Sequence, residues 1–245
     1  MRNEAKERLI FALDVDCFED AEKWVKLLHD KVGVFKVGKQ LFTRCGSDVV
    51  RMIRGEGGEV FLDLKYHDIP NTVAMAGVEA CRLGVRMFNV HALGGPEMMR
   101  ETVAKADASC PRGSAERPLL LAVTILTSST EETLRAVGID RSVREMVPRL
   151  ARLAKEAGMD GVVASPQEVG LIRDACGPEF VIVTPGVRPA FASLDDQKRV
   201  TTPAEAIAAG ADYLVIGRPI SAAADPVEAA DLILAEIEEA LRGRS

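Results

Sequence analysis

Short apolar runs rich in valine, isoleucine and leucine alternate with longer amphipathic segments along the chain. This alternation is typical of repeated βα units around a parallel sheet, because the strands are buried on both faces and each covering helix buries one apolar stripe. The eight strands we predict are Leu9–Val15, Val34–Gly38, Val60–Lys65, Met87–Ala92, Leu119–Leu126, Gly161–Ala164, Phe180–Thr184 and Tyr213–Gly217. The eight helices we predict are Glu19–Lys31, Leu41–Gly55, Asn71–Leu83, Pro96–Ala108, Val143–Ala157, Gln167–Ala175, Pro203–Ala209 and Pro226–Leu241.

The number of these units determines the expected fold class. Eight βα units within 245 residues match a single (β/α)8 barrel, the TIM barrel, and the 47% hydrophobic content supplies a large core. No break in composition marks a linker, so residues 1–245 are predicted to form one barrel domain with its active site at the carboxyl ends of the strands. A doubly wound open sheet is the alternative, but no G-x-G-x-x-G motif follows the first strand to support its dinucleotide-binding form.

Composition narrows the classes of partner. The net charge of −6 argues against a general nucleic-acid binder and against a protein that binds membrane surfaces. The five cysteines are scattered without a Cys-x-x-Cys pair, which indicates free thiols in a reducing cytoplasm. No apolar run approaches the length of a membrane span, and the charged amino-terminal segment lacks the order of a signal peptide. With three histidines and no Cys/His cluster, no metal site is predicted.

One stretch, Phe61–Thr72, places charged residues where a strand should end. Asp63 and Lys65 are two residues apart, so their side chains leave an extended strand on the same face and can converge. Asp68 follows at the turn, and Pro70 suits the first turn of the helix that comes next. Parallel α/β enzymes keep their catalytic acids and bases at such strand ends. The alternative is a structural ion-pair network, which collects charges in the same way.

Other predicted strands also carry polar residues near their carboxyl ends. These residues are Asp14 at the end of the first strand, Lys36 in the second, Asn89 and His91 in the fourth, and Thr124 and Thr127 at the end of the fifth. Because unpaired buried charge is costly, this concentration favours a functional site over a purely structural barrel.

The segments after the seventh and eighth strands have the composition of a phosphate site. Barrel enzymes often bind phosphate there, and Gly186 and Gly217 allow close approach of the backbone while Arg188 and Arg218 supply charged forks. A surface salt bridge is the alternative for Arg218. The polar segment Arg188–Thr202 is either a surface loop or a lid that folds over a bound phosphate.

Six short motifs extend from the first strand to the last: Ala12–Asp14, Phe35–Gly38, Phe61–Thr72, Asn89–Ala92, Thr184–Arg188 and Val215–Arg218. Together they closely resemble those of the bacterial orotidine 5′-phosphate decarboxylases. The Asp-x-Lys-x-x-Asp core alone is shared with related barrel enzymes such as 3-keto-gulonate 6-phosphate decarboxylase, so it identifies the superfamily and not the reaction. In the gulonate enzymes the second strand carries an acidic magnesium ligand, whereas this chain has Lys36, which cannot ligate magnesium in its charged form.

The resemblance implies the loss of CO2 from orotidine 5′-monophosphate to give uridine 5′-monophosphate, the last step of de novo pyrimidine synthesis, with neither a metal nor an organic cofactor. It implies that Lys65 is the proton donor and that Asp63, Lys36 and Asp68 complete the catalytic row of charges. The residues that it assigns to substrate binding are Asp14, Lys36, Asp63, Leu64, Lys65, Tyr66, His67, Asp68, Ile69, Pro70, Asn71, Thr72, Thr127, Pro185, Arg188, Gln197, Gly217 and Arg218. Among these, Arg188, Gly217 and Arg218 would hold the phosphate.

The resemblance also implies a homodimer in which Asp68 and Thr72 reach the substrate of the neighbouring subunit. Two other functions remain open. A magnesium-dependent sugar-phosphate decarboxylase or aldol-type enzyme of the same superfamily would be distinguished by its dependence on metal. A non-catalytic nucleotide-binding barrel would keep the pocket without turnover, although every charged position of the catalytic row is present in this chain.

Overall fold

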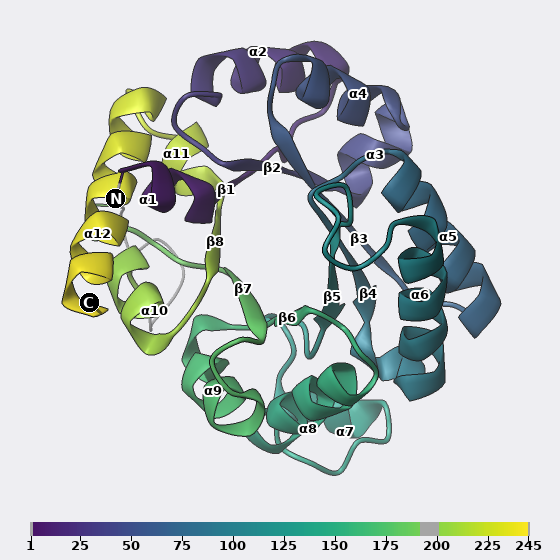
Figure 1. Cartoon of the computed structure of the whole chain (residues 1–245). Helices are drawn as coiled ribbons and strands as arrows, with labels where there is room; N and C mark the ends of the chain where they lie inside the picture. The colour runs from purple at the N-terminus through teal and green to yellow at the C-terminus, as the bar shows by residue number, and fades with distance from the viewer. Residues whose placement is uncertain (1, 192–200, 245) are drawn as a thin grey trace. The chain divides into compact units, whose positions relative to one another are not determined.

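The computed structural model describes residues 2–191 and 201–244 and contains a closed barrel of eight parallel strands in sequence order (Figure 1). The strands are β1 (Leu9–Ala12), β2 (Val34–Gly38), β3 (Glu59–Tyr66), β4 (Met87–His91), β5 (Leu119–Val123), β6 (Gly161–Val163), β7 (Val181–Pro185) and β8 (Tyr213–Ile216). The ladder closes where β1 pairs with β8. The predicted TIM barrel is therefore confirmed, and the open sheet is excluded.

The strands are apolar because both of their faces are covered. All four residues of β1 are buried, and Phe11 in β1 stands opposite Phe35 in β2. The two rings meet edge to face with their centroids 6.4 Å apart, and Trp24 packs on Phe11 at 5.4 Å. Full burial of one such side chain stabilises the fold by roughly 1.5–3 kcal/mol.

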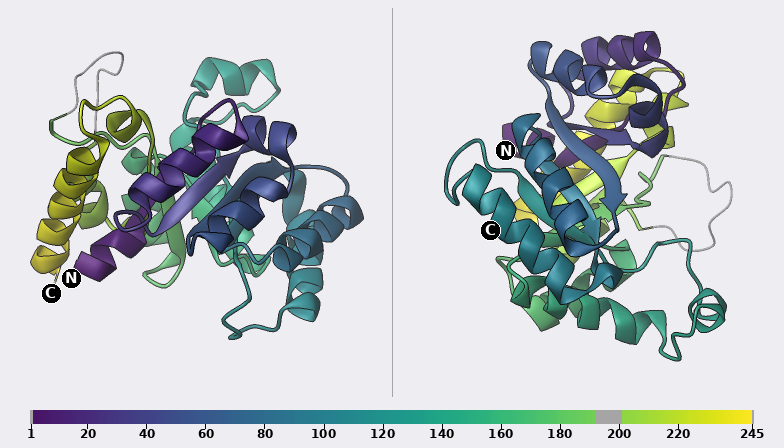
Figure 2. Two further views of the ribbon diagram at one scale, coloured as in Figure 1. Left: turned by 90° about the horizontal axis from the view of Figure 1, so that it is seen from above. Right: turned by 90° about the vertical axis from the view of Figure 1, so that its right-hand side faces the viewer.

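The chain divides into two compact units, the first made of the residues before Lys65 and those from Thr184 onward. Its helices are α1 (Arg2–Arg8), α2 (Phe18–Leu28), α3 (Lys39–Cys45), α4 (Asp48–Gly55), α10 (Pro203–Ala209), α11 (Arg218–Ser221) and α12 (Pro226–Arg244). Helix α12 packs against α1, α10 and α11, and Figures 1 and 2 show α1 beside α12. Arg2 and Lys31 both pair with Asp231 of α12, which adds an ionic contact to this apolar packing.

The second unit is Lys65–Val183. Its helices are α5 (Pro70–Arg82), α6 (Gly95–Ser109), α7 (Glu131–Ala136), α8 (Val143–Glu156) and α9 (Val169–Cys176), with the 3-10 turns η1 (Ala92–Gly94) and η2 (Pro166–Glu168). Helices α5 and α6 pack closely. Gly77 of α5 permits this, because an added Cβ atom there would lie only 3.2 Å from the Phe88 ring and 3.3 Å from Thr102 of α6. The half-buried Arg117 joins Asp107 of α6 to Asp160 before β6 with two hydrogen bonds of 2.7 Å.

The predicted helix Leu41–Gly55 is wrong, because the structure has two helices there, α3 and α4. Gly46 separates them with a φ of 60°, a left-handed conformation that glycine adopts without steric cost and that ends a right-handed helix. The short helices α1, α7 and α11 were not predicted. The other predicted elements differ from the observed ones by three residues or fewer at each end, and Thr124 accordingly lies just beyond β5.

Two further observations concern the whole of the described chain. All five cysteines are free thiols, as predicted. Within residues 2–191 and 201–244, no helix is long and apolar enough to cross a membrane.

Candidate active site

A lysine lies between two carboxylates in the first unit. The Nζ atom of Lys36, in β2, is 3.1 Å from Oδ1 of Asp14 and 3.7 Å from Oδ2 of Asp63. The side chains of Lys36 and Asp63 are only 11% and 12% exposed, whereas that of Asp14, in the loop after β1, is 69% exposed. Three of the polar residues expected near the strand ends therefore lie together.

Two glycines leave room for this cluster. Gly38 pairs with Asp63 across β2 and β3, and a Cβ atom at Gly38 would lie 3.2 Å from Nζ of Lys36. A Cβ atom at Gly217 would lie 3.2 Å from Cβ of Ala12 and 3.9 Å from Asp14. A side chain at Gly38 would crowd the Lys36 ammonium group, and one at Gly217 would crowd Ala12 beside Asp14. Gly217 was predicted as part of a phosphate site, but the space that Gly38 leaves was not predicted.

Lys65 of β3 belongs to the second unit and has an unusual backbone conformation. Its φ of 52° makes it the one non-glycine residue with a positive φ in the described part of the chain. This left-handed conformation costs about 1–2 kcal/mol for a residue with a Cβ atom. The Lys65 N–H donates to Oδ1 of Asn89 in β4 at 2.8 Å, and Asn89 is completely buried. Strained backbone held by such a contact is concentrated at functional sites.

The remainder of the Phe61–Thr72 motif forms the end of β3, a loop and the start of α5. Burial raises the pKa of the Tyr66 phenol, and the Tyr66 ring meets Phe88 at 6.3 Å. Leu64 is half-buried before the turn, and the exposed His67 ring lies 5.6 Å from that of His91. Pro70 lies in the first turn of α5, as predicted, and is its first residue.

The loop and first turn of α5 are exposed to solvent. Oδ1 of Asp68 accepts a hydrogen bond of 2.6 Å from the Ile69 N–H, and the Ile69 side chain is 67% exposed. The Thr72 N–H donates to the Ile69 carbonyl at 3.1 Å, and Asn71 and Thr72 are both exposed. Asp68 is thus presented at the surface of its own unit.

The predicted phosphate residues all belong to the first unit. Gly217 precedes α11, Arg218 is its exposed first residue, and Pro185 ends β7. Arg188 is half-buried three residues later, and its N–H donates to the Thr201 carbonyl at 3.1 Å.

Two of the predicted substrate contacts stand apart from these groups. Thr127 is exposed in the turn after β5, in the second unit. Gln197 and most of the predicted lid lie outside the described residues.

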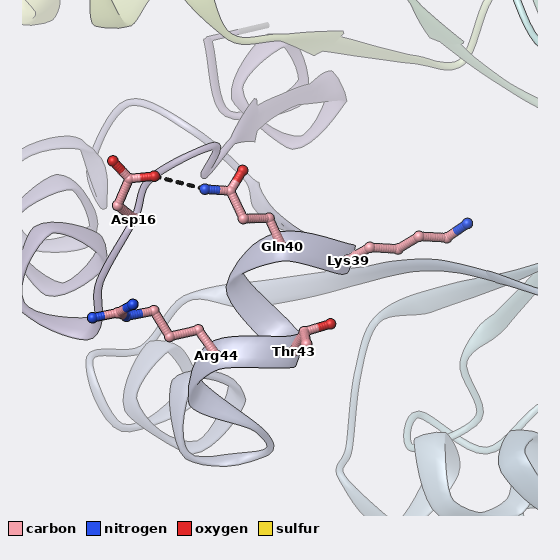
Figure 3. A pocket seen from close by; sticks show the side chains of 5 residues that line it. All are labelled: Asp16, Lys39, Gln40, Thr43 and Arg44. Atoms are coloured by element: carbon pink, nitrogen blue, oxygen red, sulfur yellow. Dashed lines mark hydrogen bonds between the residues drawn. The ribbon is translucent and has the colours of Figure 1, made fainter.

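A surface hollow of about 610 Å³ lies beside α3 and is lined by Asp16, Lys39, Gln40, Thr43 and Arg44. Nε2 of Gln40 donates to Oδ1 of Asp16 at 2.6 Å, and Figure 3 shows Gln40 and Arg44 directed toward the loop of Asp16, with Lys39 directed away. None of these five residues belongs to the predicted substrate-binding set. The concentration of buried charge around Lys36 identifies the candidate site better than the size of this hollow does.

The fold and these strand-end charges are those of an α/β-barrel enzyme, because such enzymes have their catalytic residues at the carboxyl ends of the strands. The family model described as "Orotidine 5'-phosphate decarboxylase / HUMPS family" matches residues 7–233. The chain belongs to this family, as its motifs predicted.

Relatives along the full length agree with this assignment. A protein of Syntrophotalea carbinolica named orotidine 5′-phosphate decarboxylase is 68% identical over 238 residues, which are 97% of this chain and 98% of that protein. A protein of the same name from Geobacter sulfurreducens is 66% identical over 236 residues, which are 96% of this chain and 98% of that protein. The crystal structure of orotidine 5′-phosphate decarboxylase from Lactobacillus acidophilus superposes with a TM-score of 0.82 at 39% identity, covering 94% of this chain and 98% of that one.

Proposed function

We propose that this protein decarboxylates orotidine 5′-monophosphate to uridine 5′-monophosphate and CO2, the last step of de novo pyrimidine synthesis. The observation that carries the proposal is the Asp14–Lys36–Asp63 chain of charges, whose last member stands two residues before Lys65 on β3. Membership of the family and the names of the relatives support the same reaction.

The chemical difficulty is the carbanion that forms at C6 of the pyrimidine. The bond between C6 and the carboxyl carbon breaks, CO2 leaves, and the electron pair stays on C6. In the proposal the ammonium group of Lys65 stabilises this pair by fixed charge and then transfers a proton to C6. The neutral amine regains its proton from solvent, which completes the cycle without any redox step.

Asp63 and Lys36 have supporting roles in this proposal. The Asp63 carboxylate would crowd the carboxylate of the substrate and attract the ammonium group of Lys65. Lys36 and Asp14 would meet the ribose hydroxyls. Lys36 already places a cation between Asp14 and Asp63, so the protein itself offsets one of the two negative charges. This favours the decarboxylase without a metal over the magnesium-dependent sugar-phosphate enzyme.

The phosphate would be held by Arg188, Arg218 and the backbone at Gly217. Arginine forks match phosphate oxygens in two parallel hydrogen bonds, and this binding energy could stabilise the reactive closed state. Thr127 and Gln197 would complete the contacts with the nucleotide. Removal of the phosphate from the substrate should therefore weaken turnover as well as binding.

We also propose a homodimer in which Asp68 and Thr72 act on the neighbouring subunit's substrate. Asp68 and Thr72 are exposed, and they flank Ile69, whose side chain is 67% exposed. Met75 of α5 and Leu93 of η1 are also exposed apolar side chains of the same unit, at 44% and 43%. The proposed interface would cover these apolar side chains.

The proposed reaction is tested by mixing purified, EDTA-treated protein with orotidine 5′-monophosphate and following the loss of its absorbance. We expect conversion to uridine 5′-monophosphate at full rate without added metal. Activity that returns only on addition of Mg²⁺ would indicate the metal-dependent branch of the superfamily. Tight nucleotide binding without any conversion would indicate a non-catalytic barrel.

A further inference from the structure

Glu236 of α12 accepts a backbone hydrogen bond from a residue far away in the sequence. Its Oε1 atom accepts from the Ala190 N–H at 3.1 Å, and the backbone of Ala204 also faces the carboxylate. Burial raises the pKa of Glu236, and the neighbouring Glu239 and Glu205 add to this effect, whereas the two backbone groups oppose it because they favour the charged form. A half-buried carboxylate is therefore held by one hydrogen bond to Ala190 and lies beside Ala204.

Ala190 and Ala204 lie on opposite arms of the segment that joins β7 to α10. Ala190 follows β7 on the outgoing arm, and Ala204 is the second residue of α10 on the returning arm. The first N–H groups of a helix have no partner within the helix. Thr202 satisfies one of them by accepting from the Glu205 N–H at 3.2 Å, and the Glu236 carboxylate lies beside Ala204 in the same turn.

A backbone hydrogen bond also joins the two arms to each other near Ala190. The Arg188 N–H donates to the Thr201 carbonyl at 3.1 Å, two residues before Ala190. Arg188 is therefore positioned by a backbone contact between the arms and by the attachment of its own arm to Glu236. Both contacts lie entirely within the first unit and within described residues.

Helix α12 provides a rigid base for these contacts. Ile233 and Ile237, which flank Glu236 on this helix, are completely buried. Helix α12 packs against α10 and also against α11, whose first residue is Arg218. One helix thus supports both arginines that we assign to the phosphate, α11 by direct packing and the Arg188 arm through a single carboxylate.

We infer that Glu236 is a positioning residue that fixes the outgoing arm of the β7–α10 connection to α12 and thereby holds Arg188 where it can bind the 5′-phosphate of the substrate. This inference rests on the proposed function. Glu236 itself does not touch the reacting atoms. Its removal should leave the chemistry at C6 intact and weaken only the interaction that depends on the phosphate.

The test compares Glu236→Ala, Glu236→Gln and the control Glu228→Gln, which removes an exposed carboxylate from the same helix. For Glu236→Ala we expect KM for orotidine 5′-monophosphate to rise about tenfold, equivalent to about 1.4 kcal/mol. The kcat/KM for orotidine, which lacks the phosphate, should stay within about twofold. Glu236→Gln keeps one acceptor oxygen of two, so its effect on KM should be about threefold. The control should match the wild type.

A double variant separates positioning from general destabilisation. If Glu236 acts through Arg188, Arg188→Ala with Glu236→Ala should lose no more activity than Arg188→Ala alone. Equal losses for both substrates, or additive losses in the double variant, would overturn the inference. If Glu236→Ala does not fold, as judged by thermal unfolding, the same comparison is made with Glu236→Gln.

Failure of the proposed function gives a different result. A wild-type protein without turnover of orotidine 5′-monophosphate refutes that function, and the positioning role is then measured by calorimetry with uridine 5′-monophosphate and uridine. Weaker binding of the monophosphate alone in the Glu236 variants supports the role. Unchanged binding of both ligands refutes it.

Discussion

Replacement of Lys36 by methionine should destabilise the folded protein measurably, because it removes the cation from between two carboxylates. At an effective dielectric constant of about 20, unit charges separated by 3.7 Å, as Lys36 and Asp63 are, attract by about 4.5 kcal/mol. The exposed Asp14 adds about 1 kcal/mol or less. The cost of burying the lysine offsets part of this attraction, so we expect a net loss of about 2–3 kcal/mol in the free energy of unfolding.

The assay is a double-mutant cycle with Lys36→Met, Asp63→Asn and the combined variant, measured by urea and thermal unfolding. Loss of about 2–3 kcal/mol should lower Tm by roughly 5–10 °C in a chain of this size. The combined variant should be more stable than the sum of the single losses predicts, with a coupling energy of at least about 1.5 kcal/mol. Lys39→Met, at an exposed position of α3, is the matched control and should change little. Additivity of the two single losses within about 0.5 kcal/mol would refute the reasoning.

Three further predictions concern other parts of the molecule. Arg218→Ala should weaken the use of orotidine 5′-monophosphate severely and that of orotidine much less, and equal losses for the two would contradict the phosphate assignment. Inactive Lys65→Ala chains and inactive Asp68→Ala chains, mixed and allowed to exchange, should recover about one quarter of wild-type activity. Half of the dimers would then be mixed, and each mixed dimer would hold one native site out of two. Heterodimers that form without activity would indicate that Asp68 acts in the site of its own chain. Burial raises the pKa of Glu168 to about 7 against a weaker opposing effect of the Ser165 N–H, so the folded state retains this proton to a higher pH than the unfolded state does. The free energy of unfolding should therefore fall by roughly 1–2 kcal/mol between about pH 4.5 and pH 7, after allowance for partial exposure, and then level off. In Glu168→Gln this fall should be absent. Parallel stability profiles for the two proteins would argue against the prediction.

Strong local sequence signals were sufficient to predict where some helices and strands begin and end. The bounds predicted for β2 and α10 are those observed, since β2 is an apolar run after Gly33 and α10 lies between Pro203 and Gly210. The break at Gly46 was missed because the apolar pattern continues on both sides of it. The sequence placed Asp14, Lys36 and Asp63 near the ends of neighbouring strands, and the structure adds that Lys36 pairs with both carboxylates.

Other features of the site depend on contacts that no local pattern contains. The positive φ of Lys65 is accompanied by a hydrogen bond to Asn89 on the next strand, and only the polarity of Asn89 within an apolar strand hinted at a special role. Glu236 resembles any glutamate on an amphipathic helix, because its partner Ala190 is 46 residues away. Alanine backbone groups carry no sequence signature as hydrogen-bond donors.

The most direct test of Lys65 as the proton donor is the comparison of Lys65→Ala with the wild-type protein. Alanine retains the Cβ atom, so the backbone at a φ of 52° is no more crowded than before and the fold should be preserved. We expect kcat for orotidine 5′-monophosphate to fall by about 10⁴-fold or more, because the proton donor and its positive charge are lost together. The Kd for uridine 5′-monophosphate should change by less than about tenfold, since the phosphate contacts remain. A variant that keeps a near-normal kcat would contradict the role of Lys65 and the proposed mechanism with it.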